Sequence, residues 1–483
     1  MDYDINKIKV ISALFWKIME RGGTQGIQFM VQIILARLLA PNDYGMIALI
    51  AIFIAIANVF VQNGFNTALI QKKDVNETDY SSVFYISLAV ATLLYIILFF
   101  VAPFIADFFD MPQLSYILRV LAIMLFFGAF NSIQNAVISR AMEFKKLFFS
   151  SLGAILFSGI IGIIFAYKGF GVWALVAQQL TNQFVITIIL WFTVRWRPQL
   201  IFSFARVKGL FSYGWKLLVS ALLDTLYMNL RSLIIGKIYS PAMLAFYDRG
   251  EKFPSLIVIN IDGSIQSVML PVLSSQQDNK QRVKEMMRRS VVTSSFIIFP
   301  IMTGLAAIAE PLVQILLTDK WLPCVPFLQI MCASYALYPI HTANLQAINA
   351  LGYSGIFLKL EIIKKIVGLV ILGVTFFYGV YAIAIGMLVG AIICVFINAY
   401  PNLRLLNYGY KEQWKDILPS LILSLITGII VYSFKWFHMG NGILIILQTV
   451  IGSSIYLFLA KIFKLECYTY LVTTFRGIYQ RRK

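Results

Sequence analysis

Apolar residues fill a series of long segments that are separated by short polar turns. Segments of about 20 residues or more match the hydrocarbon thickness that one α-helix crosses. The pattern therefore predicts an all-α, polytopic membrane protein with about fourteen spanning helices. We expect these helices at residues 10–36, 44–70, 80–104, 114–139, 147–167, 171–193, 211–238, 250–272, 290–316, 324–350, 356–378, 380–402, 415–436 and 442–463.

Two of these segments, 199 positions apart, carry the same polar stripe. Steps of four, four, three and four residues place each stripe on one helical face. Because such a stripe is costly against hydrocarbon, it is expected to face a bundle interior or a wet cavity. The pattern indicates a transporter with two similar halves. The first stripe is Lys17, Arg21, Gln25, Gln28 and Gln32, and the second is Lys216, Ser220, Asp224, Tyr227 and Arg231.

The repeat continues beyond the stripes with an offset that drifts to 204 residues. The matched pairs are Ala40-Pro41 with Ser240-Pro241, Asn58 with Asp262, Gln62 with Gln266, and Asp74 with Asp278. Each half holds six predicted helices, an even number, so both halves insert in the same orientation and are related by a pseudo-two-fold axis along the membrane normal. We expect lobes at 1–193 and 211–402, a cytoplasmic linker at 194–210, and two further helices with a basic tail at 403–483.

Composition supports the membrane assignment. Of 483 residues, 60% are hydrophobic and only 13% charged, which is more apolar surface than a soluble domain of this size can bury. The net charge of +18 is concentrated on alternate loops, which follows the positive-inside rule and places both termini in the cytoplasm. These bases suit anionic membrane lipids, and no nucleic-acid partner is expected. The opposite loops carry only Arg37, Lys168, Lys237, Arg249, Lys252, Lys320 and Lys435.

Basic residues inside the predicted spans are the candidates for substrate binding. Lys17, Arg21, Lys216 and Arg231 would together attract an anion, and phosphates match Arg and Lys well in a low dielectric. Arg21 lies about 17 Å into its span at the helical rise, too deep to reach the interface easily. Local pairing is the alternative: Glu20 could neutralise Lys17, and Asp224 could neutralise Arg231. A further basic residue, Arg119, is close to a span end and is expected to be interfacial.

Neutral polar residues are numerous in the same spans. Their amides could bind sugar hydroxyls, with interhelical hydrogen bonding as the alternative. They are Gln25, Gln28, Gln32, Asn58, Gln62, Asn63, Asn131, Gln134, Asn135, Asn344, Gln346 and Asn349, with Tyr227 beside them in the second stripe. Asp224 and Asp262 are candidates for proton or cation coupling, although a salt bridge and a helix cap would explain them structurally.

Motifs for other chemistries are missing from the sequence. It contains no glycine-rich phosphate loop ending in Lys-Ser or Lys-Thr, and no HExxH, GxSxG or paired CxxC motif. The four cysteines and two histidines lack zinc spacing. We therefore expect no cofactor, no metal and no enzyme activity.

Several segments resemble one family of transporters. The chain is similar to bacterial polysaccharide-transport flippases, the Wzx-like branch of the MOP superfamily, from about residue 11 to residue 407. The matching segments are Ala36–Gly45, Ile138–Lys146, Tyr213–Lys216, Asp224–Tyr227 and Ile235–Pro241.

This resemblance implies the MOP flippase fold and the bacterial plasma membrane. It implies translocation of polyprenyl-diphosphate-linked oligosaccharides for capsule, O-antigen or other extracellular polysaccharide, by alternating access between two six-helix lobes. Glycosyltransferases and a polysaccharide polymerase would be the partners. The alternatives are a lipid II flippase, a MATE-like drug exporter, for which acids should dominate the cavity, and more distantly a membrane polysaccharide polymerase or ligase, which needs a large outer loop.

Overall fold

The computed structural model describes residues 12, 15–17, 19–72, 74–437, 439–470 and 472–473, and their side chains except at 21, 63–67 and 213. The regular structure of these residues is helical, with no β-strand among them. The expected all-α class is confirmed. The chain divides into two compact units, Met1–Ala245 and Phe246–Lys483, which are described separately below.

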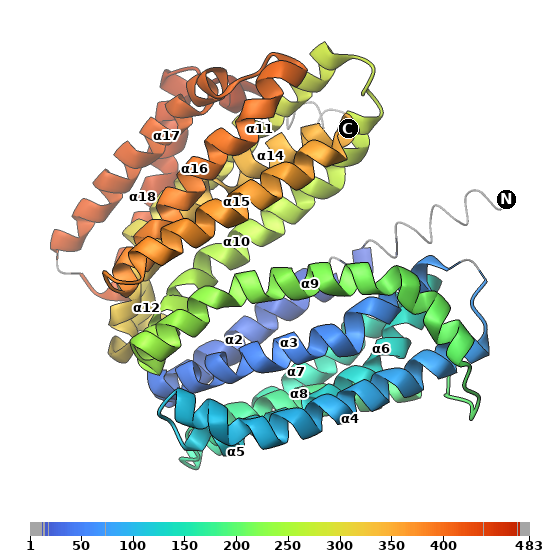
Figure 1. Cartoon of the computed structure of the whole chain (residues 1–483). Coiled ribbons are helices and arrows are strands. Elements are labelled where there is room, and N and C mark those ends of the chain that lie inside the picture. The colour runs from blue at the N-terminus through green and yellow to red at the C-terminus, as the bar shows by residue number, and fades with distance from the viewer. Residues whose placement is uncertain are drawn as a thin grey trace. The chain divides into compact units, whose positions relative to one another are not determined.

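The first unit is a bundle of long helices joined by short turns (Figure 1). Its elements are η1 Met19–Gly23, α2 Thr24–Leu38, α3 Pro41–Gln71, α4 Glu77–Phe108, α5 Gln113–Leu121, α6 Met124–Ala141, α7 Phe144–Tyr167, α8 Val172–Thr193 and α9 Phe204–Ile238. Small residues permit close packing between neighbours, as where Gly159 of α7 meets Val31 of α2.

The second unit is also a bundle of helices joined by short turns (Figure 1). Its elements are α10 Pro241–Ser274, α11 Lys280–Ala307, α12 Ala309–Leu317, η2 Asp319–Cys324, α13 Val325–Ala336, α14 Tyr338–Ala350, α15 Ser354–Thr375, α16 Val380–Leu406, α17 Tyr410–Ser433, η3 Phe434–Phe437 and α18 Asn441–Ile462. The first residues of α10, Pro241–Ala245, belong to the first unit.

Within the described residues, twelve helices are long and apolar enough to cross a membrane. The first predicted span is not among them, because α2 has only 15 residues and residues 10, 11, 13, 14 and 18 of that span lie outside the described residues. The span at 356–378 forms the 22-residue helix α15, which carries Lys359, Glu361, Lys364 and Lys365. The multi-pass membrane fold is established, and the count of fourteen stays a prediction.

Three predicted spans are broken rather than continuous. The span at 114–139 divides into α5 and α6, the span at 290–316 into α11 and α12, and the span at 324–350 into η2, α13 and α14. The first and third of these are equivalent in the repeat, so both halves interrupt the same helix. Positive φ angles at Gly171 and Gly379, just before α8 and α16, provide another equivalent pair. Interrupted helices at matching positions are typical of duplicated transporters.

Several helices begin earlier than predicted, among them α11, which begins at Lys280 instead of residue 290. Helix α9 begins at Phe204, so the end of the predicted linker 194–210 is already helical. Helix α10 begins at Pro241 instead of residue 250, because proline is favoured in the first helical turn, where its missing N–H leaves no hydrogen bond unmade.

Helix α9 belongs by its contacts to the first unit, where it packs along α3 (Figure 1). Glycines make the approach possible: Gly236 of α9 lies against Leu49 of α3, and Gly45 of α3 lies against the backbone of Pro241. The lobe boundary predicted from the repeat instead places residues 211–238 with the second half. The contact division describes packing in one conformation, so the two six-helix lobes stay a prediction.

Replacing Gly45 by leucine should destabilise the first unit. A Cβ atom at this position would overlap the carbonyl group of Pro241, and backbone cannot move aside as a side chain can. We expect a loss of about 1–3 kcal/mol or more, measured as a lower thermal midpoint and reduced monodisperse yield in detergent. Gly26→Ala is the control, because a Cβ there meets no neighbouring atom; equal midpoints for the two variants would contradict the close α3–Pro241 contact.

Candidate functional site

The polar stripe of α2 flanks the face that packs against α7. Thr24, Val31 and Leu35 are buried, and Val31 meets Gly159 of α7. The stripe residues Gln25 and Gln32 directly follow the buried residues Thr24 and Val31 in the chain, so the stripe lies beside the packed face. Gln25 and Gln32 are half-buried and Gln28 is exposed. These three amides are therefore not fully buried by packing within the first unit, and their role in a polar path stays a prediction.

The basic end of the first stripe is partly neutralised. Lys17 Nζ donates to Glu20 Oε2 at 3.0 Å and lies 5.0 Å from the centre of the Phe144 ring. The local pairing that the sequence offered as the alternative is therefore present for Lys17. Arg21 belongs to η1, but its side chain lies outside the described residues.

The second stripe runs along α9 in the first unit. Lys216, Ser220 and Asp224 are exposed there, and Tyr227 and Arg231 are half-buried. Asp224, Tyr227 and Arg231 each interact with other groups. The stripe thus presents an exposed cation, hydroxyl and carboxylate in successive turns of a membrane-length helix.

A paired polar motif lies between α3 and α6. Gln62 Nε2 donates to Asn58 Oδ1 at 3.4 Å, one helical turn away. Both groups approach α6 at Gly128, where a Cβ atom would lie 2.8 Å from each of them. Further along α6, Asn135 is half-buried, and Gln134 is buried with no partner for its amide within the described residues. Glycine at position 128 is therefore what brings the two polar helices together.

The second unit repeats this motif at the matched positions. Gln266 Nε2 donates to Asp262 Oδ2 at 2.9 Å, which reproduces the bond between Gln62 and Asn58. Asp262 is only 7% exposed, and its Oδ1 has no partner in the described part of the chain. The repeat is thus conserved in side-chain geometry, with a carboxylate in one half where the other has an amide.

Asn344, which the sequence grouped with the possible sugar ligands, instead joins three helices. Its Nδ2 donates to Gln413 Oε1 at 2.8 Å, and its Oδ1 accepts from Gln413 Nε2 at 3.0 Å and from Asn402 Nδ2 at 2.8 Å. All three amides are buried. In this conformation Asn344 links α14, α16 and α17 through interhelical hydrogen bonds.

The neighbouring turn at residues 407–409 extends this network. Gln413 also donates to the carbonyl of Tyr408 at 3.2 Å, and the Tyr408 hydroxyl donates to Asp416 at 2.8 Å. Burial, together with this hydrogen bond to a carboxylate, raises the pKa of Tyr408. The hydroxyl is therefore a stable donor at neutral pH, and the turn is held by side chains on both sides.

A charged cluster near the start of α10 was missed by the sequence prediction, which assigned Arg249 and Lys252 to an outer loop. Arg249 is 9% exposed, with its guanidinium 5.5 Å from the centre of the Trp321 ring. Glu251 accepts a hydrogen bond from the Tyr335 hydroxyl at 2.8 Å. Proline at 241, matching Pro41, was the signal that the helix begins before these charges.

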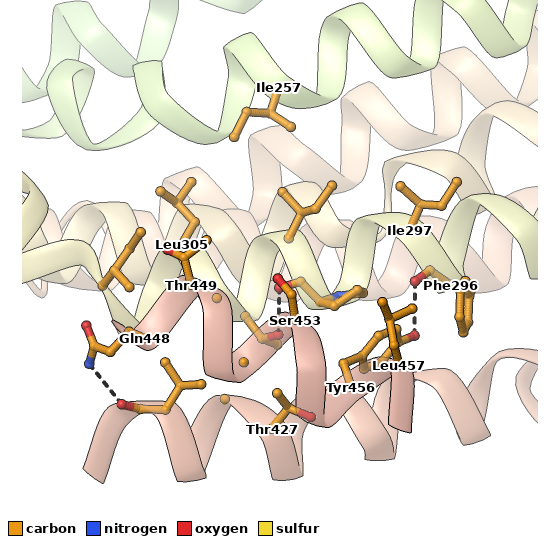
Figure 2. A pocket seen from close by; sticks show the side chains of 18 residues that line it. Ile257, Phe296, Ile297, Leu305, Thr427, Gln448, Thr449, Ser453, Tyr456 and Leu457 are labelled. Atoms are coloured by element: carbon orange, nitrogen blue, oxygen red, sulfur yellow. Dashed lines mark hydrogen bonds between the residues drawn. The ribbon is translucent and has the colours of Figure 1, made fainter. Parts of the chain in front are cut away.

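The second unit also contains a cavity of about 500 Å³ between α11, α17 and α18. Figure 2 shows Ile257, Ile297, Leu305 and Leu457 among its lining side chains. Of the polar groups in its lining, the Tyr456 hydroxyl donates to the carbonyl of Phe296 (Figure 2) and Gln448 Nε2 donates to that of Val431, whereas Thr427 Oγ1 and Gln448 Oε1 have no partner among the described residues. The rest of the lining is predominantly apolar. Such walls suit hydrocarbon, so the cavity is a poor site for sugar hydroxyls.

Comparison with known proteins identifies the family. The sequence profile described as "Polysaccharide biosynthesis protein" matches residues 34–326. The chain belongs to this polysaccharide biosynthesis protein family. The succinoglycan biosynthesis transport protein ExoT of Rhizobium meliloti (strain 1021) is 23% identical over 474 residues, covering 94% of this chain and 92% of the relative. The lipopolysaccharide biosynthesis protein WzxC of Escherichia coli (strain K12) is 22% identical, covering 87% of this chain and 88% of the relative.

Solved structures confirm the fold of this family member. The lipid II flippase MurJ in an inward closed conformation aligns with a TM-score of 0.75 at 15% identity, covering 95% of this chain and 100% of MurJ. An inward-facing multidrug resistance MATE family transporter aligns with a TM-score of 0.60 at 15% identity, covering 79% and 94% of the two chains. The MOP fold and the Wzx-like resemblance expected from the sequence are confirmed.

Replacing Asn344 by alanine tests its structural role. The change leaves the buried amides of Gln413 and Asn402 short of partners, and each such loss costs about 1–3 kcal/mol. We expect a markedly lower thermal midpoint of the purified protein. Asn349→Ala, on the same helix at a half-buried position, is the matched control and should change the midpoint little. An unchanged midpoint for Asn344→Ala would contradict the assignment as an interhelical link.

Proposed function

We propose that this chain is a flippase that carries polyprenyl-diphosphate-linked oligosaccharide repeat units across the plasma membrane by alternating access. The observation that carries the proposal is the exposed row of Lys216, Ser220 and Asp224 on a membrane-length helix. Hydrocarbon contact would make such a row costly, so it suits a water-filled path. Family membership and relatives named for succinoglycan transport and lipopolysaccharide biosynthesis favour a glycan-bearing substrate.

The cations of both stripes are proposed to hold the diphosphate. Lys216 is exposed, and Arg231 lies about four turns further along the same helix. Arg21 is proposed for the same role from its position in the first stripe. Lys17 can contribute only in competition with Glu20, to which it is paired in this conformation.

The neutral groups of the stripes are proposed to bind the sugars. Amides and phenols both donate and accept hydrogen bonds, so they can bind the hydroxyl groups of many different sugars. The proposed set is Gln25, Gln28, Gln32, Gln62, Asn135 and Tyr227. The polyprenyl tail would remain in lipid while the headgroup passes.

The cellular setting follows from the same proposal. A bacterial inner-membrane location with both termini in the cytoplasm fits the distribution of basic loops. The substrate would be made by cytoplasmic glycosyltransferases and consumed by a polymerase on the outer side. The chain itself would catalyse no covalent step.

Lipid II transport is the second candidate, because the alignment with MurJ covers nearly the whole chain. Both substrates offer a polyprenyl diphosphate, so the cations alone do not separate them. The family profile and the polysaccharide relatives favour the glycan substrate. Vesicle assays with each lipid, compared at equal concentration, separate the two: faster flipping of lipid II would replace the first proposal with the second.

Replacing Lys216 by glutamine should slow transport. The variant removes one exposed cation without unpairing a carboxylate, since no ion pair of Lys216 occurs among the described residues. We expect about tenfold slower flipping of a polyprenyl-diphosphate-linked oligosaccharide in proteoliposomes, the scale of one charge-assisted hydrogen bond, with recovery in Lys216→Arg.

Lys461→Gln, an exposed base at the end of α18, is the charge-matched control and should flip at the normal rate. Arg21→Gln tests the first stripe in the same assay. Normal flipping by both stripe variants at normal expression would exclude the stripes as the diphosphate site.

Asp262 is proposed as the coupling carboxylate. Its buried position and its unpartnered Oδ1 suit a group that exchanges a proton or small cation, whereas Asp224 on α9 is exposed and is the second choice. Asp262→Asn should abolish stimulation of flipping by an imposed ion gradient and leave gradient-free exchange intact. Asp319→Asn, at an exposed site, should respond normally; a normal response of Asp262→Asn would remove it from the coupling mechanism.

A further inference from the structure

A separate basic cavity lies at one end of the first unit, where α3 ends and α9 begins. Its volume is about 460 Å³. Two cationic side chains, Lys72 and Arg206, line it together with Gln71 and several small or apolar residues. The apolar part of the lining is Ala68, Ala205, Gly209 and Leu210.

The charges around this cavity do not balance. Asp79 of α4 is fully buried, and both of its oxygens accept from Lys72 Nζ at 2.8 Å. Arg206 Nη1 lies 3.6 Å from the same carboxylate. Two cations against one carboxylate leave one positive charge at the cavity wall. A single anion of small size would complete the set.

The same end of α3 is held by a third cation. Arg140 of α6 donates to the carbonyls of Leu69 at 2.8 Å and Ile70 at 3.1 Å, and also to that of Lys72. These carbonyls are the negative end of the α3 dipole, so Arg140 satisfies them. Nearby, the Glu77 carboxylate accepts a hydrogen bond from the Trp196 indole at 2.8 Å. Among the described residues, Glu77 forms no ion pair with Lys72 or Arg206, both of which are paired with Asp79. The surplus charge at the cavity therefore remains.

The segment before α9 is anchored to α4 by its backbone. The N–H of Gln199 donates to Ser81 Oγ at 3.0 Å, and the N–H of Ser203 donates to Ser82 Oγ at 2.9 Å. Both serines are buried. This anchoring fixes residues 199–203 beside the cavity and leaves their apolar side chains facing outward.

These outward side chains form an exposed apolar row. Leu200 is 96% exposed, and Ile201, Phe202 and Phe204 are also exposed. Arg195, Arg197 and Lys208 lie before and after them in the chain. Apolar side chains interleaved with bases are typical of a segment that lies in the interface of a membrane with anionic lipid.

We propose that this cavity binds the headgroup phosphate of an anionic phospholipid, whose acyl chains lie over Leu200, Ile201, Phe202 and Phe204. The positive wall accounts for the anionic headgroup, and the adjoining apolar row accounts for a lipid rather than a free anion. The site is distinct from the transport stripes, and it does not depend on which lipid the chain flips.

Two variants test the site without disturbing Asp79. Asp79 has two ion contacts, and Arg206→Gln removes only the longer one. The shorter contact, from Lys72, continues to neutralise the carboxylate. Gly209→Leu projects a side chain where a Cβ meets nothing within 4 Å, so it fills the cavity without a clash, and leucine is the better helix former. Arg404→Gln, an exposed base at the end of α16, is the charge-matched control.

The measurement is retention of dioleoyl phosphatidylglycerol by the full-length protein in native mass spectrometry, with dioleoyl phosphatidylcholine and inorganic phosphate as comparison probes. We expect the wild type and Arg404→Gln to retain phosphatidylglycerol about fivefold better than Arg206→Gln, the usual weight of one basic residue at an anionic membrane surface. Gly209→Leu should lose the lipid to a similar extent.

Three results would overturn the proposal. One is equal retention of phosphatidylglycerol by all four proteins. Another is retention of phosphatidylcholine by the wild type as strong as that of phosphatidylglycerol, which would show that the negative charge of the lipid is not recognised. The last is a thermal shift from inorganic phosphate as large as that from phosphatidylglycerol and lost in Arg206→Gln, which would make the cavity a site for free anions.

Discussion

Hydrocarbon offers no hydrogen bonds, and this constraint governs the polar side chains within the spanning helices. A polar group within a spanning helix must find a partner inside the bundle or a path that contains water. The structure uses both solutions. Asn344, Asn402 and Gln413 form a buried hydrogen-bond network, whereas Lys216 and Asp224 stay exposed on α9. The first arrangement holds helices together, and the second contains the side chains that we propose for substrate binding.

The same constraint explains the role of glycine in the bundle. A polar pair that is hydrogen-bonded within one helix can be shielded from lipid only if the neighbouring helix packs closely against it. Gly128 permits this for Asn58 and Gln62, and Gly45 permits the approach of α3 to Pro241. Packing in membranes lacks a strong hydrophobic driving force between helices, so such close contacts carry much of the stability.

The sequence predicted the helical class, the order of the spans and the repeat, because length, hydropathy and residue spacing are properties of the local chain. It also predicted the pairing of positions 58 and 62 with 262 and 266, which the structure repeats as a bond. It missed the helix breaks near Ile123 and Leu337. Pro339, in the first turn of α14, was the available signal for the second break. No proline or glycine adjoins Ile123, and a break there depends on tertiary packing, which hydropathy does not record.

The role of each amide was equally inaccessible to sequence reasoning. Asn344 and Asn135 have the same chemistry, but the first is buried in a network and the second is only half-buried. What distinguishes them is the presence of Gln413 and Asn402 across the interface, far away in the chain. Duplication places polar residues at matching positions in both halves, and later substitutions change single residues of this set. An amide at 58 and a carboxylate at 262 give two similar helices different chemistry, because only the carboxylate can change its charge. An ion could therefore act on one half of the duplicated set without a matching effect on the other.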